Sequence, residues 1–100
     1  MSVEVVEVHA ETQLDDLRRK IDAFDVALVR LLNARAACAL EIGRVKGRIG
    51  LPVYDPEREG VVLGNAQRLN SGPLDDEAVR RLFERVLDEA RRLEKPVVEA

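Results

Sequence analysis

The sequence is poor in the residues that most catalytic and metal sites use. Its 100 residues include one cysteine, Cys38, and one histidine, His9. These numbers exclude a disulfide framework and argue against a His/Cys zinc site and against a Ser-His or Cys-His triad. Serine occurs only at Ser2 and Ser71, so hydroxyl nucleophiles are also scarce. We therefore expect no metal and no cofactor.

Aromatic residues make up only 3% of the chain, and the net charge of −3 leaves no basic surface for nucleic acid. No apolar run approaches 18 residues, and no basic segment followed by an apolar one marks an export signal. The sequence thus predicts a cytoplasmic protein that binds neither nucleic acid nor membranes. The abundant residues are aliphatic and charged, as in helical proteins.

The stretch from Leu14 to Ile49 predicts one long helix. Its apolar residues recur at alternating steps of three and four, at Leu14, Leu17, Ile21, Phe24, Leu28 and Leu31, and again at Ile42, Val45 and Ile49. Arg35 and Cys38 occupy the two positions of the same pattern in between. Such a pattern gives a narrow apolar stripe that packs lengthwise against other helices. At ~1.5 Å per residue the helix would be roughly 54 Å long, which in so small a chain suggests oligomerisation.

The limits of this helix follow from local signals. Residues 1–11 alternate apolar and acidic residues and are interpreted as an N-terminal tail. Thr12 is a plausible N-cap, and Gly50 followed by Pro52 predicts the end of the helix. The tail is therefore expected to be separate from a helical domain at 12–95.

Two further helices are predicted beyond Pro52. Asp55-Pro56 is a start signal for a short helix at about 56–69, and residues 70–73 form a clear break. Asp75 should cap a medium helix that ends near Pro96, leaving a C-terminal tail at 96–100. The core face of this last helix is predicted to carry Val79, Leu82, Phe83, Val86, Leu87, Ala90 and Leu93. The fold class is thus all-α, with one long, one short and one medium helix.

Three cations along the long helix indicate a ligand. Arg35 occupies a position on the apolar stripe, and Arg18 and Lys46 flank the stripe 28 residues apart, roughly 42 Å along one axis. An antiparallel two-fold dimer would bring Arg35, Lys46 and the second copy's Arg18 together, as suits a ligand with several carboxylates. Alternatively, Arg18 and Lys46 extend their charges into water, and Arg35 pairs with a buried Asp or Glu.

Several segments together resemble the all-helical class of chorismate mutases. They are Leu14-x-x-Leu17-Arg18-x-x-Ile21-Asp22-x-x-Asp25-x-x-Leu28, Arg35, Glu41-Ile42-Gly43-x-x-Lys46 and Pro52-Val53-Tyr54-Asp55-x-x-Arg58-Glu59. The resemblance covers about residues 12–95, without gaps from Arg18 to Glu59. It implies an intertwined homodimeric bundle of three-helix chains that converts chorismate to prephenate in phenylalanine and tyrosine biosynthesis.

The resemblance also implies roles for single residues. Arg18 would reach into the partner's site and Arg35 would act in its own, each holding a substrate carboxylate. Lys46 would contact a carboxylate and the ether oxygen of the breaking C–O bond. Glu94 stands where many members have Gln, and it would donate a hydrogen bond to the same oxygen only when protonated. We therefore expect activity to fall as pH rises and Glu94 loses its proton.

The remaining residues implied by the resemblance surround the substrate's ring hydroxyl. Asp55 and Glu59 would contact that hydroxyl, and Arg58 would support them. A cap at Asp55 and a solvated Arg58 are the alternative interpretation of this segment. Three rival functions also remain: an isochorismate pyruvate lyase, a regulatory partner of a 3-deoxy-arabino-heptulosonate-phosphate synthase, and a helical dimer without catalytic activity.

Overall fold

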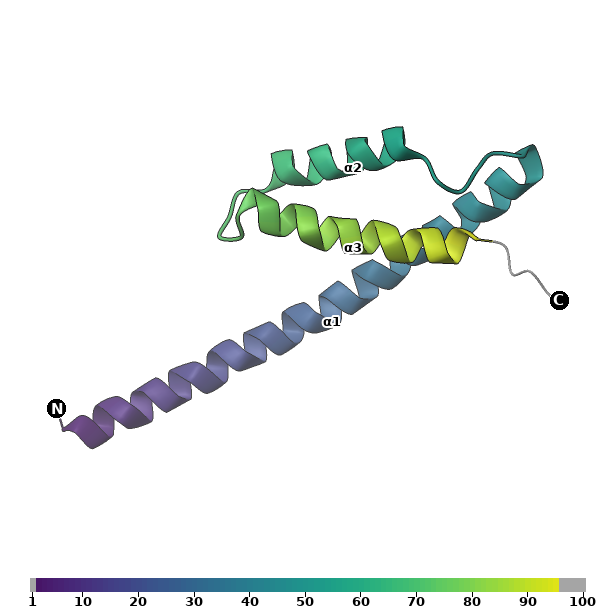
Figure 1. Ribbon diagram of the computed structural model, residues 1–100. Helices are drawn as coiled ribbons and strands as arrows, with labels where there is room; N and C mark the ends of the chain where they lie inside the picture. The colour runs from purple at the N-terminus through teal and green to yellow at the C-terminus, as the bar shows by residue number, and fades with distance from the viewer. Residues whose placement is uncertain (1, 96–100) are drawn as a thin grey trace. The chain divides into compact units, whose positions relative to one another are not determined.

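The computed structural model describes residues 2–95, which form three α-helices (Figure 1). These are α1 at Val3–Ile49, α2 at Pro56–Leu69 and α3 at Asp76–Glu94. No strand occurs within residues 2–95, so the predicted all-α class with a long, a short and a medium helix is confirmed. The predicted C-terminal tail at 96–100 and the helix end at Pro96 lie outside the described residues.

The start of α1 differs from the prediction. The helix begins at Val3, where the side-chain oxygen of Ser2 accepts a hydrogen bond from the backbone N–H of Val5 at 3.4 Å, as an N-cap does. Thr12 is not a cap, because its hydroxyl donates to the carbonyl of Val8 one turn earlier at 3.0 Å. The segment predicted to be a tail is therefore helical from Val3 onward, and its side chains are exposed.

The end of α1 and the caps of the other two helices are as predicted. Gly50 adopts a φ of +75°, and the N–H of Leu51 donates to the carbonyl of Lys46 at 2.9 Å, which closes the helix in a Schellman motif. The Asp55 carboxylate accepts from the N–H of Arg58 at 3.1 Å. Asp75 accepts from Ala78 in the same way at 2.7 Å. Local capping therefore sets these boundaries.

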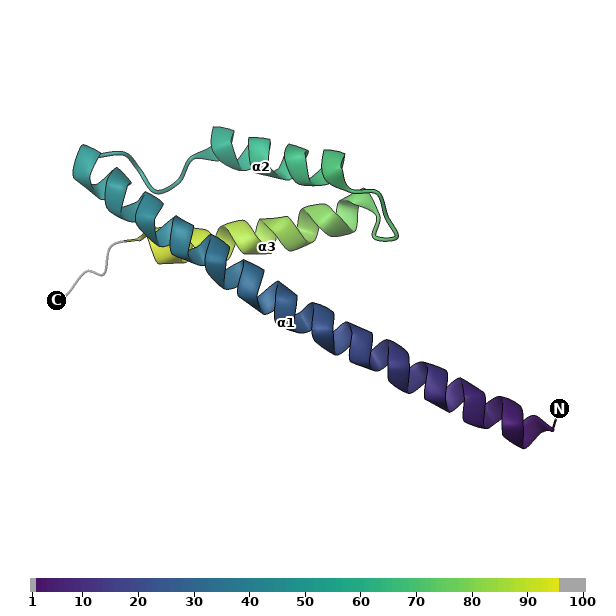
Figure 2. The same ribbon diagram turned by 180° about the vertical axis from the view of Figure 1, so that it is seen from behind.

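The chain divides into two compact units, Met1–Asn33 and Ala34–Ala100. The second unit contains the rest of α1 together with α2 and α3, and the last two helices run antiparallel side by side in both views (Figures 1 and 2). Its buried apolar side chains are small or medium in size: Ala39, Ala66, Val79 and Leu87. Leu82 and Leu93, predicted to face the core, are instead 56% and 40% exposed.

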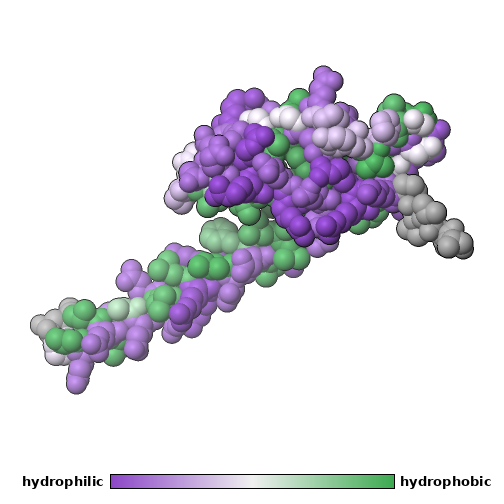
Figure 3. All heavy atoms as spheres, in the orientation of Figure 1, coloured by the Kyte–Doolittle hydropathy of each residue, from purple (hydrophilic) through white to green (hydrophobic). Residues whose placement is uncertain are grey.

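The first unit leaves its apolar stripe uncovered. Leu14 is 46% exposed and Leu31 is 68% exposed, and the stripe positions between them are similarly open. Figure 3 shows hydrophobic side chains recurring along this part of α1. A continuous apolar stripe of this length is typical of a surface that another protein element covers.

Two kinds of feature are absent from the described part of the chain. Among residues 2–95, no helix combines the length and the apolar composition needed to cross a bilayer. Within the same residues, no three His, Cys, Asp or Glu side chains gather as a metal ion would require.

Candidate active site

A cavity of about 240 Å³ lies in the second unit, between the C-terminal part of α1, the start of α2 and the end of α3. Six of the seven predicted site residues line it: Arg35, Lys46, Asp55, Arg58, Glu59 and Glu94. The seventh, Arg18, lies on α1 in the first unit and is exposed. One chain therefore brings together most of the predicted site from three helices.

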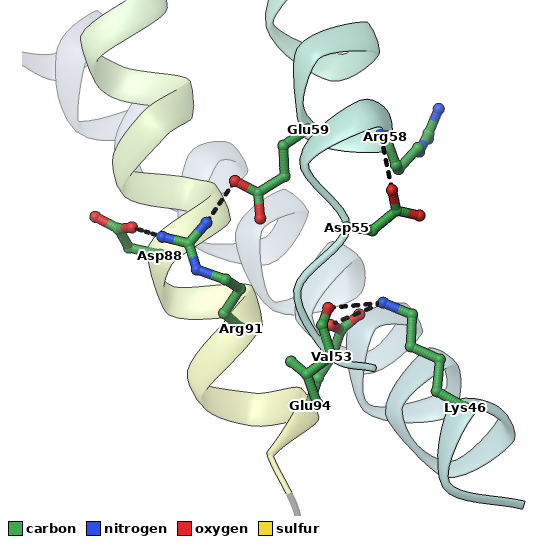
Figure 4. A network of polar contacts seen from close by, with 8 residues as sticks. All are labelled: Lys46, Val53, Asp55, Arg58, Glu59, Asp88, Arg91 and Glu94. Atoms are coloured by element: carbon green, nitrogen blue, oxygen red, sulfur yellow. Dashed lines mark hydrogen bonds and ion pairs between the residues drawn. The ribbon is translucent and has the colours of Figure 1, made fainter. Parts of the chain in front are cut away.

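Lys46 and Glu94 form the most sheltered ion pair in the cavity. The ammonium nitrogen of Lys46 lies 3.3 Å from Oε2 of Glu94, and the two side chains are only 17% and 10% exposed. The same nitrogen donates to the carbonyl of Val53 at 2.9 Å (Figure 4). Because an ammonium group has three N–H donors, these contacts fix its position and leave one donor for a ligand oxygen.

Gly43 allows Glu94 to reach this position. A Cβ atom at Gly43 would lie 2.8 Å from the Cα and 2.9 Å from the carbonyl oxygen of Glu94. Real Cβ atoms do not approach backbone atoms so closely, so α3 could not lie this near to α1 with any other residue at position 43. Sequence reasoning had assigned Gly43 no role beyond its place in a motif.

Gly43→Ala should therefore move the end of α3 and separate Glu94 from Lys46. Overpacking of this kind costs about 1–3 kcal/mol of stability, and we expect activity to fall by about tenfold or more. Gly47→Ala is the matched control on the same helix, because nothing lies within 4 Å of the added methyl group. It should stabilise the protein by up to ~1 kcal/mol. Thermal unfolding gives the stability of both variants, and kcat gives their activity. Equal stability and equal activity of the two variants would contradict the steric argument.

Arg35 is half-buried and lines the cavity. None of the ion pairs formed by residues 2–95 includes it, so the alternative that Arg35 pairs with a buried Asp or Glu of its own chain is wrong for the described residues. A guanidinium group held in a cavity without a carboxylate partner is suited to bind an anionic ligand in a bidentate manner.

The start of α2 supplies the remaining predicted residues. Asp55 is the N-cap of α2, which confirms the structural interpretation of this residue, and it also lines the cavity. Arg58 is exposed, and its guanidinium group points away from Lys46 and Glu94 (Figure 4). Glu59, one turn into the helix, has a side chain that is 20% exposed.

The partner of Glu59 is Arg91, a residue that sequence reasoning missed. Its guanidinium group donates to Glu59 and to Asp88 (Figure 4) and lies 5.7 Å from the centre of the Tyr54 ring. The hydrogen bond to Glu59 is the main cause that raises the pKa of Arg91, so the guanidinium stays charged. The spacing of Arg91 in the sequence could have identified it as a site residue. Arg91 follows Leu87 by four residues and precedes Glu94 by three, which places it on the same helix face as both.

The cavity is therefore a cationic site with fixed donors. Four cationic side chains line it, Arg35, Lys46, Arg58 and Arg91, against three carboxylates. Cys38 also lines it, and among residues 2–95 no side-chain hydrogen bond joins its thiol to another group. This all-helical fold and its cationic cavity define a class of site that is suited to hold a small, multiply anionic molecule through charged side chains.

Comparison with known proteins identifies the family. The profile of the chorismate mutase type II family matches residues 17–95, and the chain belongs to this family. The resemblance inferred from the residues is thereby confirmed. A solved structure of chorismate mutase (form II) from Thermus thermophilus superimposes with a TM-score of 0.81 at 36% identity, covering 82% of this chain and 93% of that one.

Two curated relatives show how much of a protein the chain corresponds to. It is 44% identical over 92 residues to the bifunctional chorismate mutase/prephenate dehydratase of Pseudomonas aeruginosa, covering 87% of this chain and 25% of the relative. It is 26% identical to the chorismate mutase of Methanocaldococcus jannaschii, covering 87% of this chain and 89% of that protein. The chain thus spans about a quarter of the length of the bifunctional relative.

Proposed function

We propose that this chain is a chorismate mutase that catalyses the intramolecular [3,3] rearrangement of chorismate to prephenate, in the cytoplasm, for phenylalanine and tyrosine biosynthesis. The observation that carries the proposal is the cavity in which Arg35, Lys46 and Glu94 converge. The rearrangement is unimolecular and needs neither a nucleophile nor an obligatory proton transfer. It needs a compact substrate conformer and stabilisation of the negative charge that grows on the ether oxygen.

Lys46 and Arg35 supply these two functions in the proposed mechanism. The free N–H donor of Lys46 points to the ether oxygen, and the hydrogen bonds that Lys46 donates to Oε2 of Glu94 and to the carbonyl of Val53 hold it in place before the substrate arrives. A protonated Glu94 still accepts this bond at one oxygen while its hydroxyl donates to the substrate. Arg35 binds one substrate carboxylate. Because Lys46 is already oriented in a site partly shielded from water, it stabilises the transition state without reorganising.

The start of α2 binds the other end of the substrate. In the proposed complex, Asp55 and Glu59 accept a hydrogen bond from the ring hydroxyl. Arg58, next to Glu59 in sequence, supports the site from the exposed side of α2. Asp55 uses one carboxylate oxygen, Oδ1, to cap the helix, so its second oxygen is the one available to the ligand.

A homodimer completes the site in this proposal. The exposed stripe from Leu14 to Leu31 needs a covering surface, and the same stripe of a second copy is an apolar match. Antiparallel pairing about a two-fold axis would bring Arg18 of the second copy level with Lys46. That arginine would bind the second substrate carboxylate.

The direct test is conversion of chorismate by the purified protein, followed by loss of chorismate absorbance and identification of prephenate. Release of pyruvate from isochorismate, without prephenate formation, would favour the lyase instead. A rate that appears only after addition of a 3-deoxy-arabino-heptulosonate-phosphate synthase would favour the regulatory partner. Inactivity under all three conditions would contradict an enzymatic role.

The pH dependence tests the role of Glu94. A protonated carboxyl donates a hydrogen bond to the ether oxygen, whereas the ionised form repels the growing charge. We therefore expect the wild-type rate to fall as pH rises and Glu94 loses its proton. Glu94→Gln keeps a donor that has no proton to lose, so its profile should be flat. A wild-type rate that is already flat from pH 5 to 8 would count against this role.

A further inference from the structure

The pair of Glu59 and Arg91 joins the two helices that enclose one end of the cavity. Oε1 of Glu59 on α2 accepts from Arg91 on α3, and among the described residues no donor is bonded to its second oxygen. Figure 4 shows Arg91 joined to Asp88 on its other side. The contacts with Asp88 and Tyr54 hold Arg91 in place, so the Glu59 carboxylate is fixed with one oxygen left for a ligand.

This pair is sheltered compared with the ion pairs on the outer surface of α3. The side chains of Arg91 and Glu59 are 30% and 20% exposed, whereas those of Arg85 and Glu89 are 67% and 50% exposed. Charges that are partly shielded from water and salt are screened less, so they act more strongly on a ligand beside them. Glu59 therefore presents an acceptor oxygen whose negative charge is partly offset by Arg91, which also pairs with Asp88.

Charge cancellation determines what kind of group this oxygen accepts. An unpaired carboxylate in a sheltered site attracts an ammonium group more strongly than a hydroxyl, because the ammonium carries a full charge. A carboxylate already paired with a guanidinium still accepts a hydrogen bond from a hydroxyl. An ammonium group there would instead meet the nearby positive charge of Arg91.

We infer that Arg91 is a specificity-determining residue, which acts through Glu59 to make the cavity accept a ring that carries a neutral hydroxyl and reject one that carries an ammonium group. This inference rests on the proposed function, because it takes Glu59 to face the ring hydroxyl of chorismate. Arg91 does not touch the reacting atoms, and it is a positioning residue.

The experiment compares kcat/KM for chorismate and for its analogue with an amino group in place of the ring hydroxyl. Wild type, Arg91→Gln, Arg91→Lys and Arg92→Gln are measured with both compounds. Arg92 is the matched control, because it is adjacent, 66% exposed and paired with Glu89 outside the cavity. Arg91→Gln should shift the ratio of the two constants by about tenfold toward the amino compound. Arg91→Lys should keep most of the wild-type preference, and Arg92→Gln should leave it unchanged.

A merely structural role for Arg91 gives a different result. If Arg91 only held α2 against α3, Arg91→Gln would slow both compounds by the same factor, and the unchanged ratio would overturn the inference. Should Arg91→Gln fail to fold, Glu59→Gln is the second variant. It removes one of the two carboxylates that pair with Arg91 and should shift the preference further toward chorismate, whereas a shift toward the amino compound would equally overturn the inference.

Equilibrium binding separates this inference from the proposed function. If wild type converts neither compound, the proposed function fails. The ratio of the two dissociation constants, measured by calorimetry, then still tests Arg91. A ratio that is equal in wild type and Arg91→Gln would reject the specificity role.

Discussion

Arg35→Ala is expected to lower kcat/KM for chorismate by about a thousandfold, without unfolding the protein. The half-buried guanidinium of Arg35 lines the cavity, and no carboxylate among residues 2–95 pairs with it. Truncation therefore removes a donor aimed at the ligand and breaks no ion pair of the described chain. Loss of chorismate absorbance gives the rate, and circular dichroism and thermal unfolding report on the fold.

Arg44→Ala is the matched control for this variant. Arg44 lies on the same helix but is 67% exposed and paired with Glu41, outside the cavity. It should keep nearly wild-type activity. A small dicarboxylate should also raise the melting temperature of wild type and of Arg44→Ala, but not of Arg35→Ala, because only binding to the native state stabilises it. An active Arg35→Ala variant would remove Arg35 from the proposed mechanism.

Mixing Arg18→Ala with Arg35→Ala should restore activity that each variant lacks alone. In the proposed two-fold dimer, each site takes Arg35 from one copy and Arg18 from the other. A mixed dimer then has one site with both arginines and one site with neither. Random exchange makes about half of the dimers mixed, so about a quarter of all sites should be intact.

The two variants are unfolded together, refolded as a mixture and assayed for prephenate formation. Refolding each variant separately is the control for activity regained through refolding itself. If Arg18 acted in the site of its own chain, every site of a mixed dimer would lack one of the two arginines, and the mixture would remain inactive. A fully active Arg18→Ala protein would show that Arg18 does not take part at all.

These predictions share one physical basis, which is that the charges of the site are oriented before a ligand binds. Lys46 is held by Glu94 and Val53, and Glu59 is held by Arg91. Each contact leaves one donor or one acceptor facing the cavity. Catalysis of a unimolecular rearrangement then requires little beyond correct placement, which suits a cavity lined by charged side chains on three helices.

The sequence alone was sufficient for features that local interactions decide. The start of α2 and the start of α3 follow from Asp55, Pro56 and Asp75, whose side chains and ring act within one turn. The cation on the apolar stripe, Arg35, was identified by helical spacing. Both kinds of feature depend on residues that are close in the chain, and their physical chemistry is therefore visible in the sequence.

Local sequence signals gave a wrong start for α1, because the same segment could be interpreted as a tail or as part of the helix. Residues 3–11 alternate apolar and acidic residues, and Thr12 looked like a cap, yet the helix continues back to Val3. Thr12 satisfies its hydroxyl on the carbonyl of Val8, which a helical threonine does as readily as capping. Ser2 caps the helix instead, because its side-chain oxygen accepts a hydrogen bond from the N–H of Val5.

Tertiary structure decided the contacts that make the site work. Glu59 meets Arg91 across 32 residues, and Lys46 meets Glu94 across 48. Gly43 matters only because the backbone of Glu94 passes next to it. Such contacts depend on the distance and rotation at which helices pack, to which many side chains contribute at once. A sequence pattern defines the face on which a residue lies, but the packing of the helices determines which residue of another helix it meets.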